Sequence, residues 1–345
     1  MRVLVTGATG FVGFHTAVSL RRAGHEVRAL VRSPEKGDRV LAPAGLGKDA
    51  LAVGDMTDES AVREALRGCD AVVHAAASVS VTRPGAGDAF RENVAGARAV
   101  LGGAAEAGLP RILFVSSLQA VYDPRRGVPP PELPPVEVRT RYGRSKAESE
   151  RFARELQGRG APLAIVYPSG VIGPDDPGLS ESVRAYRGFL RAVILAGGTQ
   201  FVDARDLARL HLRLLERGGS ARVVAAGHFF RWGELADRIE RITGARIRRI
   251  GAPGALLRGL GSAADLLARL TGRGGVLTRE AMEVATRWEA IPDSPEVAAL
   301  GVRWRDPDET LADLYRWLVT AGRLPASAVP RLAPAPGGAS GGGGG

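Results

Sequence analysis

The chain has 345 residues, of which 45% are hydrophobic and 24% are charged, and its formal net charge is +10 at pH 7. This composition is typical of a globular protein with a substantial core and excludes a largely disordered chain. The arginines are spread over every segment and form no basic stripe with interleaved aromatic residues, so we do not expect a nucleic acid partner.

The number and spacing of the cysteine and histidine residues and the length of the apolar runs exclude disulfide-bonded, metal-binding and membrane-spanning proteins. The single cysteine, Cys69, cannot form an internal disulfide, and the five histidines lack the spacing of metal ligands. No apolar run approaches the roughly 18 residues that cross a bilayer. The amino terminus shows no secretory signal pattern. We therefore expect a cytoplasmic protein with no metal site and no integral membrane segment.

The first half of the chain alternates short runs rich in Val, Ile and Leu with segments of helical length. This alternation predicts an α/β fold, a Rossmann-type doubly wound parallel sheet with helices on both faces. The predicted strands cover 2–6, 26–31, 51–53, 70–75, 111–116 and 163–167, and the predicted helices cover 11–23, 58–67, 88–107 and 142–157.

The rhythm changes after Tyr167, where the Gly/Pro-rich stretch PSGVIGPDDPG leads into mainly helical pieces at 231–243, 255–271 and 308–322. We expect these pieces to form a smaller, mainly helical C-terminal substrate lobe. A short strand and helix at 201–216 could return to the first lobe. The predicted domains are a dinucleotide-binding domain at 1–167 with 200–217 returning to it, a substrate lobe at 168–199 and 218–325, and a disordered Gly/Pro-rich tail at 326–345.

One helical stretch has two interpretations. Between 255 and 270 five leucines fall on one helical face, and such a stripe packs either against its own protein or on a membrane surface. Packing within the protein is the commoner case and the one we expect, while membrane contact stays open. The leucines are Leu256, Leu257, Leu260, Leu267 and Leu270.

The stretch TGATGFVG places Gly7, Gly10 and Gly13 directly after the first predicted strand, with Phe11 and Val12 before the last glycine. A glycine series implies a close approach to the backbone, and a strand, a glycine-rich turn and a helix start together form an anion site. The first interval is one residue wider than in G-x-G-x-x-G. We expect the pyrophosphate of a dinucleotide here; the alternative is a tight turn without a ligand.

The end of the second predicted strand bears on the choice of cofactor. Arg32 stands there, and the planar guanidinium suits the extra phosphate of NADP. No carboxylate stands at that strand end in the sequence. We therefore predict NADP(H) as the preferred cofactor, with NAD(H) as the alternative.

Three polar residues carry the predicted chemistry. Tyr142 and Lys146 are four residues apart in a predicted helix, so the ammonium can lie near the phenol and favour its ionised form. That makes a tyrosine usable as an acid or base. Ser117 ends the strand RILFVSS, where a hydroxyl can hold a carbonyl oxygen. The alternative is a solvated helix face and an ordinary turn serine.

Taken together, TGATGFVG, HAAA at 74–77, FVSSLQAVY, YGRSK and YPSGVIGP resemble the extended short-chain dehydrogenase/reductase family over roughly residues 1–215. The resemblance implies that Tyr142 donates or takes the proton. It also implies that Lys146 binds the nicotinamide ribose and lowers the pKa of the tyrosine, and that Ser117 orients the substrate oxygen.

The resemblance also assigns softer positions around the cofactor. It puts Asp55 and Met56 along the adenine, and Ala75 and Ala76 along the cofactor backbone. It places Asn93 near the proton path. It places the segment from Pro168 through Val171 next to the nicotinamide.

Two departures separate the subfamilies. Leu118, Gln119 and Ala120 stand where nucleotide-sugar dehydratases carry Thr-Asp-Glu, which disfavours elimination chemistry. The run GGTQFVDARD lacks the glycine and Arg-Asp-Phe pattern of the nucleotide-sugar epimerases. The pattern looks more like the dihydroflavonol-reductase and 3β-hydroxysteroid-dehydrogenase branch, with Ser117 five residues before Tyr122 and Ser116 as a less favoured substitute.

We therefore predict an NADP(H)-dependent oxidoreductase that acts on a ketone, an aldehyde or a secondary alcohol of a small, fairly apolar substrate. The first alternative is an NAD-dependent sugar epimerase, and the second is a nucleotide-sensing protein without catalysis. Substrate identity, the direction of hydride transfer and the oligomeric state stay open, with a homodimer as one option.

Overall fold

The computed structural model describes residues 1–77, 89–122, 141–271 and 279–332. Within the helices, the side chains of 141–143, 269–270 and 280–281 also lie outside the description. The predicted catalytic residue Tyr142 is therefore described by its backbone alone.

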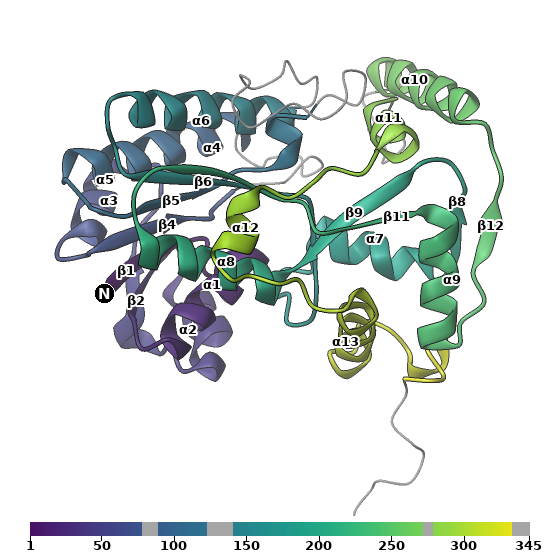
Figure 1. Cartoon of the computed structure of the whole chain (residues 1–345), viewed down its shortest axis with the longest axis horizontal. Coiled ribbons are helices and arrows are strands. Elements are labelled where there is room, and N and C mark those ends of the chain that lie inside the picture. Colours follow the sequence, from purple (N-terminus) through teal and green to yellow (C-terminus); the bar gives the residue numbers. More distant parts are fainter. Residues whose placement is uncertain (78–88, 123–140, 272–278, 333–345) are drawn as a thin grey trace, which may run out of the picture.

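A seven-stranded parallel sheet forms the centre of the larger lobe (Figure 1). Its strands are rich in Val, Leu and Ile, and the inner strands are buried on both faces, as expected when helices cover a parallel sheet on both sides. The predicted Rossmann-type fold is confirmed. In sheet order the strands are β10 (Ala221–Ala225), β6 (Leu163–Pro168), β5 (Ile112–Val115), β4 (Ala71–His74), β1 (Arg2–Thr6), β2 (Glu26–Val31) and β3 (Leu51–Val53).

Helices cover both faces of this sheet, and each face has its own apolar cluster (Figure 1). The continuous helix predicted at 88–107 is present but contains a π-helical turn, η3 (Arg98–Gly102), between two α-helical parts. On one face lie α1 (Phe11–Arg22), α2 (Pro34–Leu41) and α8 (Ala204–Arg217); on the other lie α3 (Glu59–Leu66), α4 (Ala89–Ala97), α5 (Gly103–Glu106) and α6 (Arg141–Gly158).

The smaller lobe has a third apolar cluster, built around Phe201, Tyr186 and Tyr315. It contains two small sheets, of order β11-β9-β7 and β12-β8. Its strands are β7 (Gly170–Ile172), β8 (Ala192–Ile194), β9 (Gly198–Asp203), β11 (His228–Arg231) and β12 (Arg248–Ile250), and its helices are α7 (Glu181–Phe189), α9 (Trp232–Thr243), α10 (Gly254–Thr271), α11 (Arg279–Arg287) and α13 (Pro307–Thr320).

Two parts of the chain lie elsewhere than the predicted domains place them. Strand β10 falls within 218–325 but pairs with β6 in the large sheet, and α12 (Pro295–Ala299) packs beside it. The predicted start of the disordered tail, residue 326, is too early in the chain. Val329 is fully buried, and the backbone N–H of Arg331 donates to the carbonyl of Thr243. Residues 333–345 lie outside the description. We propose that β10 and α12 count with the dinucleotide-binding domain.

Four short 3₁₀ turns complete the described elements: η1 (Ala42–Ala44), η2 (Lys48–Ala50), η4 (Leu118–Ala120) and η5 (Ala326–Ala328). None of the described helices combines the length and the low charge that crossing a bilayer requires.

Candidate active site

The predicted site residues follow six strands of one parallel sheet. Because these strands run in the same direction, their carboxyl ends meet at one edge, where ligands of such folds bind. The topology therefore brings to that edge the residues after β1 (Gly7, Gly10), β2 (Arg32), β3 (Asp55, Met56), β4 (Ala75, Ala76), β5 (Ser117) and β6 (Pro168).

The glycine turn between β1 and α1 is held together by the protein's own backbone. Gly7 has φ +75°, and a Cβ there would lie 2.7 Å from the Cα of Ala76. A Cβ on Gly13 would lie 2.2 Å from the carbonyl oxygen of Gly7. Two of the three glycines are therefore required by contacts within the chain, whereas the sequence argument ascribed the close approach to a ligand.

Gly10 differs, because the nearest atom to a Cβ there is 3.3 Å away. It is the N-cap of α1, no side chain caps this helix start, and its first turn holds no acidic residue. Phe11 is 7% exposed and contacts His15 edge-on, while Val12 is half-buried against the core. The N–H groups of the helix start thus lack a side-chain acceptor, which fits a pyrophosphate.

Arg32 and Asp55 meet at the neighbouring strand ends. The guanidinium of Arg32 is 76% exposed and lies 3.9 Å from a carboxylate oxygen of Asp55. Partial burial acts to raise the pKa of Asp55, but hydrogen bonds from Thr57 and the charge of Arg32 lower it overall. Ser33 caps α2 by accepting the N–H of Lys36. The sequence alone predicts no carboxylate at this strand end, but Asp55 lies there because it follows the neighbouring strand β3.

The residues after β3 and β4 contact the glycine turn and the helices behind it. Met56 points toward α4, since a Cβ on Gly96 would lie 2.7 Å from its sulfur. The N–H groups of Ala75 and Ala76 donate to the carbonyl and the hydroxyl of Thr6. Both alanines therefore line the turn at which the cofactor is expected.

Lys146 is the buried charge of the site. It is 5% exposed, and its ammonium donates to the carbonyl of Val115, the last residue of β5, at 3.0 Å. Burial lowers the pKa of Lys146 to about 8, and Glu150, one helical turn further along α6, acts in the opposite direction. The ammonium also lies over the ring of Phe114, 5.4 Å from its centroid. The helix thus fixes a cation at the end of the strand that leads to Ser117.

His74 lies behind this lysine and is neutral. Burial lowers the pKa of His74 to about 3, and the charge of Lys146 acts in the same direction. Its ring stacks on Phe114, and its Nδ1 lies 2.8 Å from the hydroxyl of Thr6. The sequence pattern assigned no role to His74, which links the glycine turn to the lysine.

The two serines after β5 have different surroundings. The hydroxyl oxygen of Ser117 accepts the N–H of Gln119 at 3.2 Å, so its own proton stays available to a substrate oxygen. Ser116 is 3% exposed, and its hydroxyl has no partner among the described residues. Ser117 is half-buried and keeps the better access, while Ser116 is the one whose buried hydroxyl lacks a partner.

Asn93 ties α4 to α6 beside the lysine. It is 4% exposed, and its side-chain amide donates to the hydroxyl of Ser145 at 3.2 Å. The hydroxyl of Ser149 donates to the carbonyl of Asn93. Asn93 therefore contacts the neighbours of Lys146 in α6.

Glu150 is a buried acid that the sequence patterns did not single out. It is fully buried, and one oxygen accepts the hydroxyl of Tyr167 at 2.5 Å and the guanidinium of Arg154 at 2.8 Å. Its other oxygen has no partner among the described residues. Burial raises the pKa of Tyr167, so this phenol stays a donor. The regular spacing of Tyr142, Lys146, Glu150 and Arg154 along α6 was the available signal.

The remaining predicted positions lie at the junction of the lobes. Pro168 ends β6, and Val171 lies in β7, where it packs against apolar clusters of both lobes. Ser169, between them, donates to the carbonyl of Ala226 at 2.6 Å. This segment passes from one lobe to the other directly after the large sheet.

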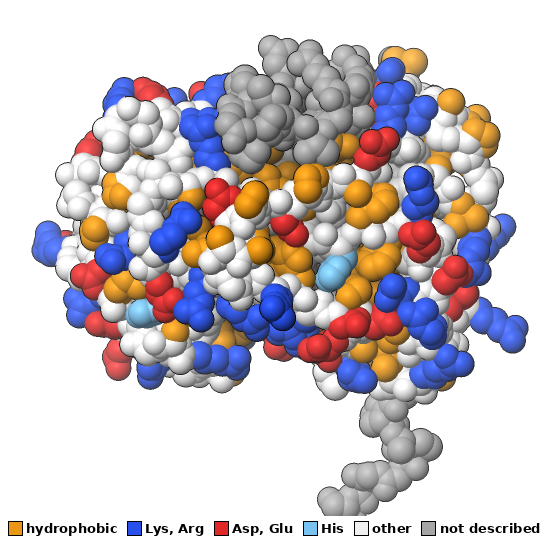
Figure 2. Space-filling view, viewed as in Figure 1, with side chains coloured by type: hydrophobic (Ala, Val, Ile, Leu, Met, Phe, Trp, Pro, Cys, Tyr) orange, Lys and Arg blue, Asp and Glu red, His pale blue; other side chains and the backbone are white. Residues whose placement is uncertain are grey.

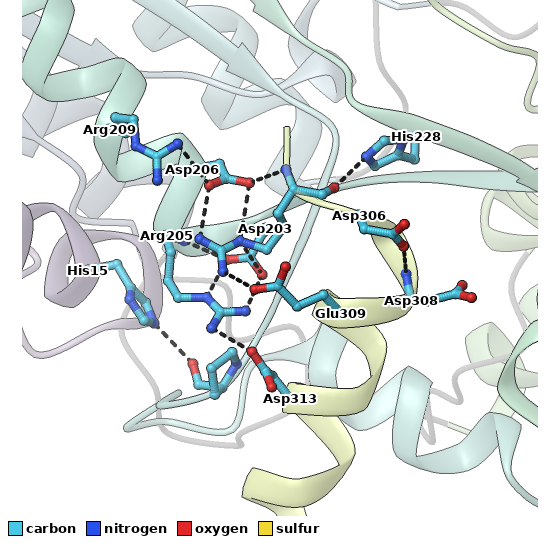
Figure 3. Close-up of polar contacts among 12 residues, drawn as sticks. His15, Asp203, Arg205, Asp206, Arg209, His228, Asp306, Asp308, Glu309 and Asp313 are labelled. Carbon is cyan, nitrogen blue, oxygen red and sulfur yellow. Dashed lines mark hydrogen bonds and ion pairs between the residues drawn. The ribbon is translucent and has the colours of Figure 1, made fainter. Parts of the chain in front are cut away.

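A second group of buried charges lies where α8 and α13 meet (Figure 3). Asp203 accepts three hydrogen bonds from Arg205, and Asp206 accepts three from Arg305. Arg205 also bonds to Asp313 of α13 at 2.7 Å. We call these five residues the α8 ion cluster. It joins α8 of the larger lobe to α13 of the smaller lobe.

Three comparisons place the chain among known proteins. The pattern of the NAD dependent epimerase/dehydratase family matches residues 3–227. "Sterol demethylase protein B" of Methylococcus capsulatus is 32% identical over 276 residues, which are 78% of this chain and 83% of that relative. A "Putative dihydroflavonol 4-reductase" of Synechocystis is 33% identical over 223 residues, which are 63% of this chain and 64% of the relative, so the match spans just under two thirds of the latter. The crystal structure of gox2253 superposes with a TM-score of 0.79 at 29% identity, covering 93% of this chain and 99% of the other.

Proposed function

The chain belongs to the NAD dependent epimerase/dehydratase family, and we propose that it is an NADP(H)-dependent oxidoreductase acting on a ketone, an aldehyde or a secondary alcohol of a small, fairly apolar substrate. The predicted resemblance to the extended short-chain dehydrogenases/reductases is confirmed, and the chain is an NAD(P)-dependent oxidoreductase. The substrate class and the preference for NADP(H) are the proposal.

The observation that carries the proposal is the buried ammonium of Lys146 at the end of β5. Lys146 lies one helical turn after Tyr142 in α6. Its ammonium donates to the carbonyl of Val115, the residue that precedes Ser116 and Ser117 in the chain. A positive charge there stabilises an ionised phenol, which enables Tyr142 to exchange a proton near neutral pH. A pKa of about 8 leaves most of the lysine protonated at pH 7.

In the direction of reduction, a nicotinamide cofactor held at this strand edge would provide the hydride for the carbonyl carbon. Ser117 donates a hydrogen bond to the substrate oxygen, and Tyr142 gives its proton to that oxygen, so that the carbonyl becomes an alcohol. Lys146 offsets the negative charge left on Tyr142. The open helix start at Gly10 would hold the pyrophosphate, and Ala75 and Ala76 would line it.

The preference for NADP(H) is supported by Arg32. Arg32 is exposed at the carboxyl end of β2, and Lys36 lies in the first turn of the helix that follows. A phosphate there would replace Asp55 as the partner of Arg32. We expect kcat/KM to be higher with NADPH than with NADH. Arg32→Ala should reduce this preference, measured as kcat/KM with NADPH divided by kcat/KM with NADH. A higher kcat/KM with NADH would refute the preference.

The central test is Tyr142→Phe, assayed by NADPH oxidation against a panel of aldehydes, ketones and sterols. The variant should lose turnover while it binds NADPH with nearly unchanged affinity. Tyr186→Phe, on α7 in the smaller lobe, is the matched control and should keep its activity. A Tyr142→Phe enzyme that retains a tenth or more of the wild-type rate contradicts the role.

The same purified protein tests the epimerase alternative. A sugar epimerase would retain NAD through purification and would convert sugar substrates without net cofactor consumption. Mass identification of any nucleotide released on denaturation therefore separates the two functions.

A further inference from the structure

Helix α10 turns an apolar face outward. Leu256, Leu260 and Leu267 follow one another along this face and are 56%, 49% and 60% exposed. Leu266 beside them is 58% exposed, and Ala263 in the same row is exposed too. The predicted inward packing of this leucine stripe is therefore wrong for Leu256, Leu260 and Leu267 and is confirmed for Leu257, which is 7% exposed. The side chain of Leu270 lies outside the described residues.

The polar residues of α10 hold the helix on the protein. Arg258 donates to the hydroxyl of Thr286 in α11 at 2.8 Å. Asp265 accepts the backbone N–H of Arg279, at the start of α11, at 3.1 Å. A surface helix usually turns its polar side to water and its apolar side to the core, and α10 does the reverse for most of its leucines.

Two further exposed apolar side chains lie at the ends of the two-stranded sheet β12-β8 in the same lobe. Leu195 and Ile250 are 44% and 41% exposed, and the N–H of Leu195 donates to the carbonyl of Ile250. Among the described residues, the one other exposed large hydrophobic side chain is Val53 in the larger lobe. On the α10 side of the molecule Figure 2 shows hydrophobic side chains and Lys or Arg side chains, with some Asp and Glu side chains among them. We call this surface, Leu195, Ile250 and the leucines of α10, the α10 face.

The chain segment around the α10 face is rich in arginine. Over 245–287, from β12 to the end of α11, eight arginines and three acidic residues give a formal charge of +5. Arg249 and Arg279 pair with acidic residues, while Arg246 and Arg248 are exposed and have no ion pair among the described residues. A symmetric contact with a second copy would bring these like charges together, whereas an anionic bilayer would neutralise them.

We propose that the α10 face docks on the surface of a bilayer that contains anionic lipid. The leucines would enter the boundary between headgroups and acyl chains, while the exposed arginines Arg246 and Arg248 would pair with lipid phosphates. Since α10 does not span a bilayer, the contact is interfacial and reversible. This inference does not depend on the proposed oxidoreductase activity.

Flotation of the full chain with lipid vesicles tests the proposal. We expect it to bind phosphatidylcholine vesicles that contain about one third phosphatidylglycerol, and to bind pure phosphatidylcholine at least tenfold more weakly. The double variant Leu260→Ser with Leu267→Ser should bind the anionic vesicles at least about tenfold more weakly. Val53→Ser removes an equally exposed apolar side chain from the other lobe and should bind as the wild type does.

Three outcomes would overturn the proposal. The first is a full chain that does not float with anionic vesicles. The second is a double variant that binds them unchanged, because the contact would then be general attraction by arginine. The third is a wild-type dimer in solution that the double variant converts to a monomer, which would assign the face to a second copy. Circular dichroism and NADPH binding establish that the variants are folded.

Discussion

Two groups of buried charge among the described residues differ in how completely their members are paired. In the α8 ion cluster, Asp203 and Asp206 each accept three hydrogen bonds from arginine, and the arginines bridge to α13. Along α6, Lys146 has a carbonyl as its partner, and one oxygen of Glu150 has none among the described residues.

This difference separates two uses of buried charge. A satisfied cluster fixes one arrangement of the lobes, and breaking it leaves an uncompensated charge. A buried charged group that lacks hydrogen-bond partners lowers stability. Such groups are found where they bind a ligand or transfer a proton. The α6 groups should therefore govern turnover, and the α8 ion cluster should govern stability.

Lys146→Met tests whether the buried charge on α6 serves turnover and not stability, and we expect it to have the largest effect. We expect kcat to fall by about a thousandfold, because the charge that makes Tyr142 a proton donor is gone. Stability to denaturant should stay equal or rise, since methionine fills the same space without a buried charge. Steady-state kinetics and urea unfolding of the same preparation measure both. A variant that unfolds far more easily would show that Lys146 is a structural residue.

Asp206→Asn is the reciprocal change in the α8 ion cluster. It should lower the free energy of unfolding by about 3 kcal/mol, because the guanidinium of Arg305 loses the nearer of its two buried carboxylate partners and keeps only Asp203 at 3.4 Å. The turnover of the folded fraction should hardly change.

The matched control for that change is Glu309→Gln. Glu309 bonds to the same Arg305 at 3.0 Å but is 55% exposed, so its loss should cost at most about 0.5 kcal/mol. Equal losses of stability in the two variants would show that burial does not distinguish these pairs.

The sequence predicts the central sheet well because burial on both faces leaves unmistakable apolar runs. It also predicts the glycine turn, although Gly7 and Gly13 are required because a Cβ there would clash with the protein's own backbone. The pairing of Arg32 with Asp55 could not be predicted, since the alignment of β2 with β3 brings these residues together.

Other features depend on longer-range contacts. Arg305 reaches Asp206 from 99 residues away, and nothing local in either segment specifies the partner. For α10, the leucine spacing defines an apolar face but contains no information on which face turns inward. Strand β10 is short and follows a glycine-rich turn, so its place beside β6 depends on the completed sheet.

Glu150→Gln makes the smallest change and tests whether Glu150 acts through Lys146. The carboxylate raises the pKa of Lys146 against the effect of burial, so its loss should lower that pKa further below about 8. Reduction needs the protonated lysine, and the pH above which kcat declines should therefore move down by about one unit, with little change at pH 6. Glu155→Gln, on the same helix but 52% exposed and paired with Arg159, is the control and should leave the profile in place. A uniform loss of kcat at every pH would instead assign Glu150 a packing role.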